Sequence, residues 1–329
     1  MCSLLLGNNG VEGSRKLSRE EELDLEKQLK LLNKPAVKTI RMRPASHPKS
    51  LSRDKDSSTV GKQPLNIGLK GGGCPVGTVP IRRTTKDDLI RAKLFSERLD
   101  SLDTNPLATG TSAFHVSSFY YDYAIVRTKS IANRKFKGAG AKISIYNPRV
   151  QPLQLSSAQI KIQNGGDSIQ VGWTVNPILY GDNRTRLFTF LNVSSIGYAD
   201  NMFLYAIEDY SGTWWLVMGR DNTKIGFWPQ SIFSGLADLG TYVEWGGEVA
   251  SVQGIPSPEM GTGDFPTGDT KFDAFCRDIV VVNEFNYTVR ATYTERFSDD
   301  PNYYQVQDKR FTDFGHLVLF GGFGGIIAH

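Results

Sequence analysis

Near residue 113 the hydrophobic pattern changes from helical periodicity to alternation of period two. Residues 17–33 predict a helix, because Ser18 and Glu21 are spaced as a capping box and leucines recur along one face. A second helix is expected to begin near residue 85. Between them, residues 36–66 are rich in Pro, Ser, Lys and Arg with little periodicity, which is typical of a mobile linker.

From residue 113 onward, short alternating runs are separated by turn residues, with no helical pattern between them. This arrangement predicts a mainly β protein, an antiparallel sandwich or barrel, after an N-terminal segment with one or two helices. The strand candidates are Tyr123–Val126, Ala141–Tyr146, Gln159–Gln163, Ser168–Val175, Arg186–Leu191, Phe203–Ile207, Trp214–Met218, Tyr242–Val249, Asp278–Val282 and Leu317–Phe320.

Two of these runs, residues 167–176 and 242–249, alternate between an apolar face and a polar face. Each polar face contains a glycine, which allows another backbone to approach closely. The polar positions are Gln170, Gly172, Thr174 and Asn176 on the first run, and Glu244, Gly246 and Glu248 on the second.

Two interpretations of these polar faces remain open. If the strands lie near each other, the faces form a floor for an extended peptide, with a carboxylate and a carboxamide projecting from it. Alternatively, they are two ordinary half-buried strands with solvated outer faces.

Composition and charge narrow the class of protein. The 329 residues suffice for two domains, and 40% hydrophobic and 22% charged residues are typical of a globular chain. The first 110 residues hold 20 Lys and Arg against 13 Asp and Glu, a net charge of +7, while the remainder is at −3. Such a basic segment can dock on its own acidic body or bind nucleic acid or lipid. The basic residues are scattered without aromatic interleaving, so nucleic acid is disfavoured, and no apolar run is long enough to span a membrane.

Common catalytic and metal-binding signatures are missing from the sequence. It contains no GxSxG, HExxH or GxxxxGK[ST] motif, its three Cys form no CxxC, and its four His lack ligand spacing. We therefore expect neither a metal nor a cofactor.

Several sequence motifs follow one another along the chain. The N-terminal ones are Leu29–Ile40 and Cys74–Arg83, and the later ones are Val171–Trp173, Leu179–Asp182, Thr185–Phe188, Trp214-Trp215, Gly226–Pro229, Trp245–Glu248 and Met260–Gly263. With these motifs in this order, the chain resembles the neprosin family of plant proteins. That resemblance implies an activation peptide over residues 12–112 and a β-sandwich peptidase domain over residues 113–329 that is shortened between residues 190 and 214.

The resemblance also implies a function and a compartment. Members are glutamic peptidases that cut after proline at acidic pH and are secreted as zymogens, with the pro-segment as an intramolecular inhibitor. The sequons at Asn183, Asn192 and Asn286 suit a secreted glycoprotein, although the chain shows no complete signal peptide.

Catalysis in the resembling family rests on two glutamates, and Gln170 stands at the position of the first. For the second we expect Glu248, with Glu244 as second choice. Glu248 would activate water while Gln170 steadies the oxyanion. The expected substrate-binding residues are Gly172, Trp173, Thr174, Trp245 and Gly246. Because Gln cannot transfer a proton, a non-catalytic sandwich that binds extended peptide or cell-wall polymer is the alternative.

Overall fold

A computed structural model of the chain describes residues 18–32, 84–91, 93, 119–192, 206–209, 212–218 and 223–327. The expected linker at 36–66 and the Cys74–Arg83 motif lie outside the described residues.

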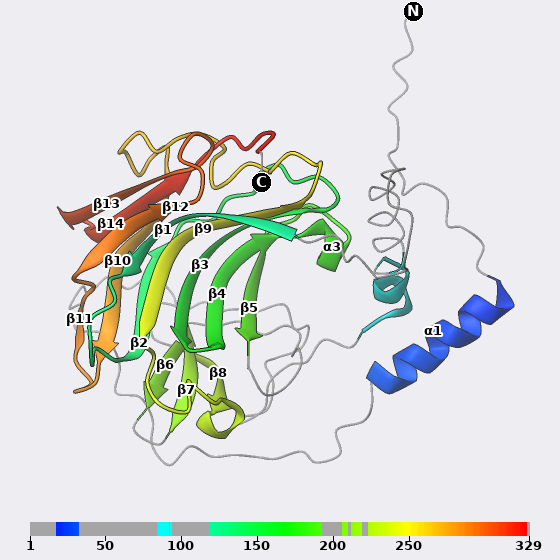
Figure 1. Cartoon of the computed structure of the whole chain (residues 1–329), viewed down its shortest axis with the longest axis horizontal. Coiled ribbons are helices and arrows are strands. Elements are labelled where there is room, and N and C mark those ends of the chain that lie inside the picture. Colours follow the sequence, from blue (N-terminus) through cyan, green and yellow to red (C-terminus); the bar gives the residue numbers. More distant parts are fainter. Residues whose placement is uncertain are drawn as a thin grey trace, which may run out of the picture.

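Two antiparallel sheets form the body of the molecule (Figure 1). In spatial order, the six-stranded sheet contains β12 (Thr294–Ser298), β1 (Phe119–Thr128), β9 (Tyr242–Val252), β3 (Gln154–Asn164), β4 (Asp167–Val175) and β5 (Arg186–Asn192). The eight-stranded sheet contains β13 (Gln305–Thr312), β14 (Gly315–Gly321), β10 (Ala274–Asn283), β2 (Phe136–Ile143), β6 (Ala206–Asp209), β7 (Thr213–Met218) and β8 (Thr223–Pro229), with β11 (Thr288–Arg290) paired to β10.

This architecture confirms the predicted mainly β, antiparallel sandwich. Every one of the ten predicted runs overlaps an observed strand. The run at 141–146 extends past the end of β2 at Ile143, and residues 203–205 of the run at 203–207 lie outside the described residues. Strands β8, β11, β12 and β13 were not predicted. Their polar or turn-rich sequences lack a clear apolar face, and tertiary pairing decides their conformation.

The inner faces of the two sheets share one hydrophobic core. The apolar positions of β4 and β9 turn inward as the alternation predicted, and Trp245 packs among side chains of the opposite sheet such as Phe320 and Ile279. Polar anchors complement this core. The buried carboxylate of Asp167 accepts hydrogen bonds from the backbone N–H groups of Ser234, Gly235 and Leu236, which fixes the segment before β9 to the start of β4.

The N-terminal segment contains the two predicted helices. Helix α1 (Arg19–Leu32) has the predicted capping box, since the Glu21 N–H donates to Ser18 Oγ at 3.2 Å and the Ser18 N–H donates to Glu21 Oε2 at 2.9 Å. Residues 86–91 are also helical, and the Thr85 hydroxyl accepts the Asp88 N–H at 3.2 Å. Ion pairs Lys86–Glu22 (3.0 Å) and Lys93–Glu21 (2.8 Å) link the two helices.

A short third helix, α3 (Pro177–Tyr180), follows β4. The sequence had not predicted it. Its signals are local: the Asn176 side chain accepts the Leu179 N–H at 3.0 Å, Pro177 occupies the first turn, and Gly181 ends the helix with a φ of 74°.

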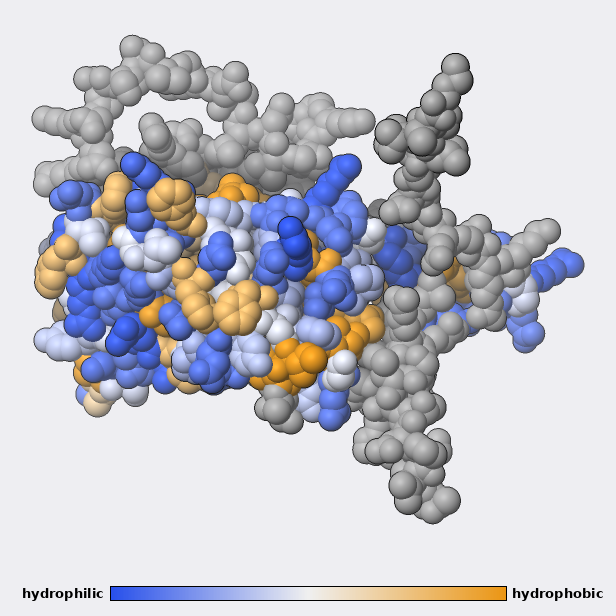
Figure 2. All heavy atoms as spheres, turned by 90° about the horizontal axis from the view of Figure 1, so that it is seen from above, coloured by the Kyte–Doolittle hydropathy of each residue, from blue (hydrophilic) through white to orange (hydrophobic). Residues whose placement is uncertain are grey.

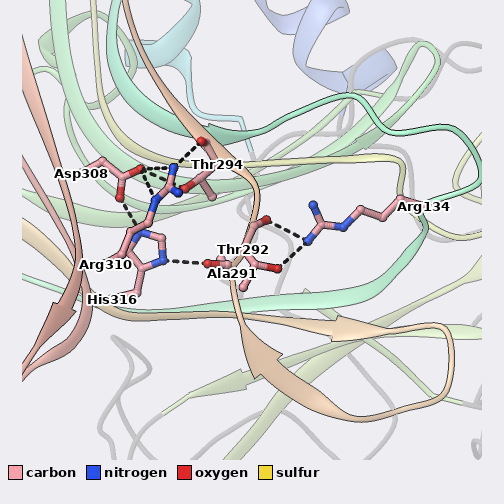
Figure 3. Close-up of polar contacts among 7 residues, drawn as sticks. All are labelled: Arg134, Ala291, Thr292, Thr294, Asp308, Arg310 and His316. Atoms are coloured by element: carbon pink, nitrogen blue, oxygen red, sulfur yellow. Dashed lines mark hydrogen bonds and ion pairs between the residues drawn. The ribbon is translucent and has the colours of Figure 1, made fainter.

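One side of the sandwich is closed by a buried polar network (Figure 3). There the edge strand β12 of one sheet lies beside the edge strand β13 of the other. His316 on β14 contacts Asp308 Oδ1 through Nε2 at 2.5 Å and the Ala291 carbonyl through Nδ1 at 2.8 Å. Asp308 Oδ2 also accepts the Thr294 hydroxyl at 2.9 Å, so the cluster joins strands of both sheets.

The exposed large hydrophobic side chains are spread over many elements, and the face seen in Figure 2 intersperses them with hydrophilic ones. Within the described residues, no helix is long and apolar enough to cross a bilayer.

Candidate active site

The polar face of the six-stranded sheet carries every residue expected to take part in catalysis. Strand register arranges this face in three transverse rows, each running from β1 through β9, β3 and β4 to β5. The rows are Tyr123–Glu248–Ser157–Thr174–Arg186, Ile125–Gly246–Gln159–Gly172–Phe188 and Arg127–Glu244–Lys161–Gln170–Phe190.

Two carboxyl groups lie on β9 in this face, and both are buried. Glu244 is 3% exposed and Glu248 is 8% exposed. Glu244 Oε2 accepts the Tyr242 hydroxyl at 2.5 Å, and Glu244 Oε1 accepts Gln159 Nε2 at 3.3 Å. Since both side chains are buried, the alternative of a solvated outer face is wrong for β9.

The environment of Glu248 disfavours its ionised form. Burial, together with the negative charge of Glu244, raises the pKa of Glu248 from 4.5 to about 7, against smaller opposing effects of Lys161 and of a hydrogen bond to Gln159. Burial and the charges of Glu248 and Glu244 also raise the pKa of Tyr123 on the neighbouring strand, so that its hydroxyl stays protonated. The site therefore holds an acid that keeps its proton up to near neutral pH.

Glycines in the middle row let the strands approach closely, as predicted. A Cβ on Gly172 would lie 1.8 Å from the Ala158 carbonyl oxygen, and one on Gly246 would lie 2.3 Å from the Ala124 carbonyl oxygen. Gly246 also has a φ of 147°, a backbone conformation that residues with a side chain rarely adopt. These two positions shape the backbone of the floor on either side of Gln159.

A pocket of about 390 Å³ opens over this floor. Its lining combines the carboxyl and amide groups with aromatic and aliphatic side chains. It is formed by Tyr121, Tyr123, Leu155, Ser157, Gln170, Thr174, Asn176, Leu179, Tyr180, Phe188, Thr189, Phe190 and Glu248. Gln170 and Glu248 thus line one pocket, but they come from different rows with β3 between their strands.

The turn after β4 forms one end of the pocket. Arg186 pairs with both carboxylate oxygens of Asp182, at 2.5 and 2.8 Å, and its guanidinium lies 4.5 Å from the ring centroid of Tyr180. This ion pair lowers the pKa of Asp182 to about 2. Arg186 thereby holds Tyr180 against the end of the pocket.

Two expected substrate-binding residues are in the wrong place for that role. Trp173 and Trp245 point to the core face, are 3% and 0% exposed, and donate their indole N–H groups to the carbonyls of Ser144 (2.6 Å) and Gly140 (3.2 Å). Because successive side chains of a strand alternate, these residues cannot face the pocket when their neighbours do. Of the expected set, Thr174 lines the pocket, while Gly172 and Gly246 lie in the middle row of the same sheet face.

Gln159 and the aromatic lining were not among the site residues expected from the sequence. Gln159 is fully buried and lies diagonally across from both glutamates, since it pairs with Gly246 midway between them. Alternation in β3, where Gln159 and Lys161 interrupt buried apolar residues, was the available signal. The tyrosines of β1 had no such signal, because only the register shows that they lie beside Glu248.

Comparison with known families agrees with this architecture. The Neprosin family model matches residues 152–202 and 192–323, just over half of the chain, and the two ranges overlap between β5 and β6. The matched residues include five of the six strands of the sheet that carries the pocket face, together with α3 and both buried glutamates. On this sequence match and the sandwich fold, the chain belongs to the Neprosin family.

Proposed function

We propose that the protein is a glutamic-type endopeptidase that hydrolyses extended, proline-containing peptides at acidic pH. The observation that carries the proposal is the pair of buried carboxyl groups on β9: Glu248 lines an open pocket, and Glu244 lies on the same face of the strand. Two nearby carboxyls in unequal environments can divide the roles of acid and base between them.

In the proposed mechanism, the pair exchanges one proton with the substrate and one with water. Glu248, which lines the pocket with its pKa raised to about 7, is neutral in acid and protonates the leaving amine nitrogen. Glu244 serves as the base that takes up the proton released by the attacking water. This assignment differs from the expectation that Glu248 activates water. A general acid must hold its proton at the working pH, and the raised pKa of Glu248 keeps it protonated in acid.

Gln170 keeps its expected role in the proposal. Its carboxamide lines the pocket and can donate an N–H to the oxyanion of the tetrahedral intermediate. A donor of this kind contributes about 10²–10³ in rate where it has been removed from other enzymes. Lys161, between Gln170 and Glu244 in the same row, adds positive charge to this side of the floor.

The aromatic lining of the pocket favours binding of a peptide that carries a flat apolar side chain. Tyr121 and Tyr123 stack with their ring centroids 6.5 Å apart, and Tyr180, Phe188 and Phe190 lie on the opposite side of the pocket. Aromatic faces pack well against a pyrrolidine ring. Proline preference itself comes from the family resemblance.

The proposal is tested by peptide cleavage. Purified protein freed of its N-terminal segment is incubated with a proline-containing peptide between pH 3 and 7, and products are identified by mass spectrometry. We expect cleavage in acid and a loss of at least about 100-fold for Glu248→Gln and for Glu244→Gln. Glu284→Gln, at an exposed turn, is the matched control. Cleavage that persists in both site variants would end the assignment.

The second candidate is a non-catalytic sandwich that binds peptide on the same face. It is favoured by Gln170, which stands where the resembling family has a glutamate. A fluorescent proline-rich peptide that binds the wild-type protein, remains intact at every pH and is released by Phe188→Ala would support this alternative.

We further propose that the N-terminal segment inhibits the site. The Arg91 side chain packs on Gly181, where a Cβ would lie 3.1 Å from Arg91 Nη1, next to the end of the pocket formed by α3. The hydrogen bond from Lys93 lowers the pKa of Glu21 to about 2, so this link between the two helices persists in moderate acid. Secretion, which would deliver the zymogen to an acidic compartment, remains a prediction.

If this contact is inhibitory, Arg91→Ala in the full chain raises peptide cleavage or peptide binding at neutral pH. Lys86→Ala, which removes only an exposed contact to α1, is the control. Equal signals from Arg91→Ala and the wild-type chain would exclude inhibition through this contact.

A further inference from the structure

Gln159 occupies an unusual position between the two buried glutamates. In the middle row its neighbours on β9 and β4 are both glycines, Gly246 and Gly172, so neither strand places a side chain beside it. Diagonal neighbours on adjacent strands are about 7–8 Å apart, within reach of a long side chain. Gln159 is therefore placed to reach Glu244 on one diagonal and Glu248 on the other.

Its amide acts on both carboxyl groups. Nε2 donates to Glu244 Oε1 at 3.3 Å, and on the other diagonal the amide lowers the pKa of Glu248. Gln159 is 0% exposed, and its Oε1 atom is buried with no hydrogen-bond partner among the described residues. An unpaired buried carbonyl costs free energy. A protein keeps such a group only where another interaction compensates for this cost.

The charge of the pair fixes the orientation of this amide. Only the NH₂ group can face a carboxylate, since the opposite orientation would set the carbonyl oxygen against a negative charge. With Nε2 donating to Glu244, Oε1 is left buried without a donor among the described residues.

We infer that Gln159 is a positioning residue of the carboxyl pair: its amide bridges Glu244 and Glu248 across β3 and β9 and stabilises negative charge on these carboxyl groups. The catalytic meaning of this inference rests on the proposed peptidase function, whereas the bridge itself does not.

The bridge is tested on the protein without any substrate. Carboxyl carbons of glutamate are labelled with ¹³C, the Glu248 signal is assigned through Glu248→Gln, and its titration is followed by NMR. Replacing Gln159 by Met keeps the length of the side chain but removes the donor. We expect the titration midpoint of Glu248 to rise by about half a pH unit or more.

Gln163→Met on the same strand is the matched control, because the Gln163 amide donates only to the Gly165 carbonyl at 2.9 Å. We expect it to leave the midpoint of Glu248 unchanged. A folded Gln159→Met variant with the wild-type midpoint would overturn the inference.

A measurement on the wild-type protein covers the case in which Gln159→Met does not fold. The side-chain NH₂ signals of Gln159 should be protected from exchange and should shift with the same midpoint as Glu248. Signals that stay constant through that transition would also overturn the inference. Both NMR measurements can be made even if the protein cleaves no peptide. Failure of the peptidase proposal can therefore be distinguished from failure of this inference.

Discussion

At the scale of single residues, Glu248 shows how burial sets chemistry. A glutamate on the polar face of a strand would ordinarily be ionised at neutral pH, yet here burial and the charge of Glu244 hold the proton on it. Because Glu248 is buried, its ionisation lowers the free energy of unfolding.

The stability of the protein should therefore fall as pH rises through the titration of Glu248. Below pH 4.5 both folded and unfolded states bind the proton, so the group contributes no pH dependence. Between 4.5 and about 7 the folded state binds more protons, and the free energy of unfolding decreases with pH. Above 7 the loss is complete, at about 3 kcal/mol.

Urea denaturation at pH 4 and pH 8 measures this contribution. We expect the difference in unfolding free energy between Glu248→Gln and the wild-type protein to move by about 3 kcal/mol in favour of the variant from pH 4 to pH 8. Glu284→Gln should show no such movement. A pH-independent difference for Glu248→Gln would mean that Glu248 is ionised normally in the folded protein.

At the scale of elements, the α3 turn depends on one arginine. Arg186 on β5 binds Asp182 with two nitrogens and stacks on Tyr180, which ties the turn to the neighbouring strand. Lysine offers a point charge that neither pairs in bidentate fashion nor stacks as a plane.

Arg186→Lys should loosen this end of the pocket without unfolding the sandwich. We expect faster hydrogen exchange in residues 177–184 and a peptide affinity weaker by about 3- to 10-fold, the effect of losing one partly exposed pair and one stacking contact. Arg184→Lys, in the same turn and exposed, is the control for charge and position. Unchanged exchange in residues 177–184 would show that the turn is held by other contacts.

At the scale of the whole molecule, the network in Figure 3 joins the two sheets where their edge strands meet. Both ring nitrogens of His316 lie within hydrogen-bond distance of an oxygen, Ala291 O for Nδ1 and Asp308 Oδ1 for Nε2. Burial opposes ionisation of Asp308, but hydrogen bonds from His316 and Thr294 outweigh it, so the pKa of Asp308 lies below its usual value.

Asp308 should accordingly stabilise the sandwich above pH 3.8, and this contribution should be lost as pH falls through its lower folded pKa. Asp308→Asn should cost about 1–3 kcal/mol at pH 6, because the buried His316 ring and the Thr294 hydroxyl lose their carboxylate partner. Thermal denaturation at pH 6 and pH 2 measures both effects. Asp313→Asn, in the exposed β13–β14 turn, should be neutral. An Asp308→Asn variant as stable as the wild-type protein at pH 6 would contradict this role.

The sequence by itself determined the class of fold, the inward faces of β4 and β9, and the capping of α1, because these depend on residues near one another in the chain. Alternation showed that Gln170, Glu244 and Glu248 share the polar side of their strands. It could not show which residues oppose one another, since register is set by pairing between distant strands.

Only the tertiary structure decided the composition of the site. Pairing of β9 with β1 and β3 brings Tyr123 and Gln159 beside Glu248, places Gln170 in the row of Glu244, and buries both acids. The physical reason is that proton affinity depends on desolvation and on neighbouring charge, and both come from strands that lie far apart along the chain.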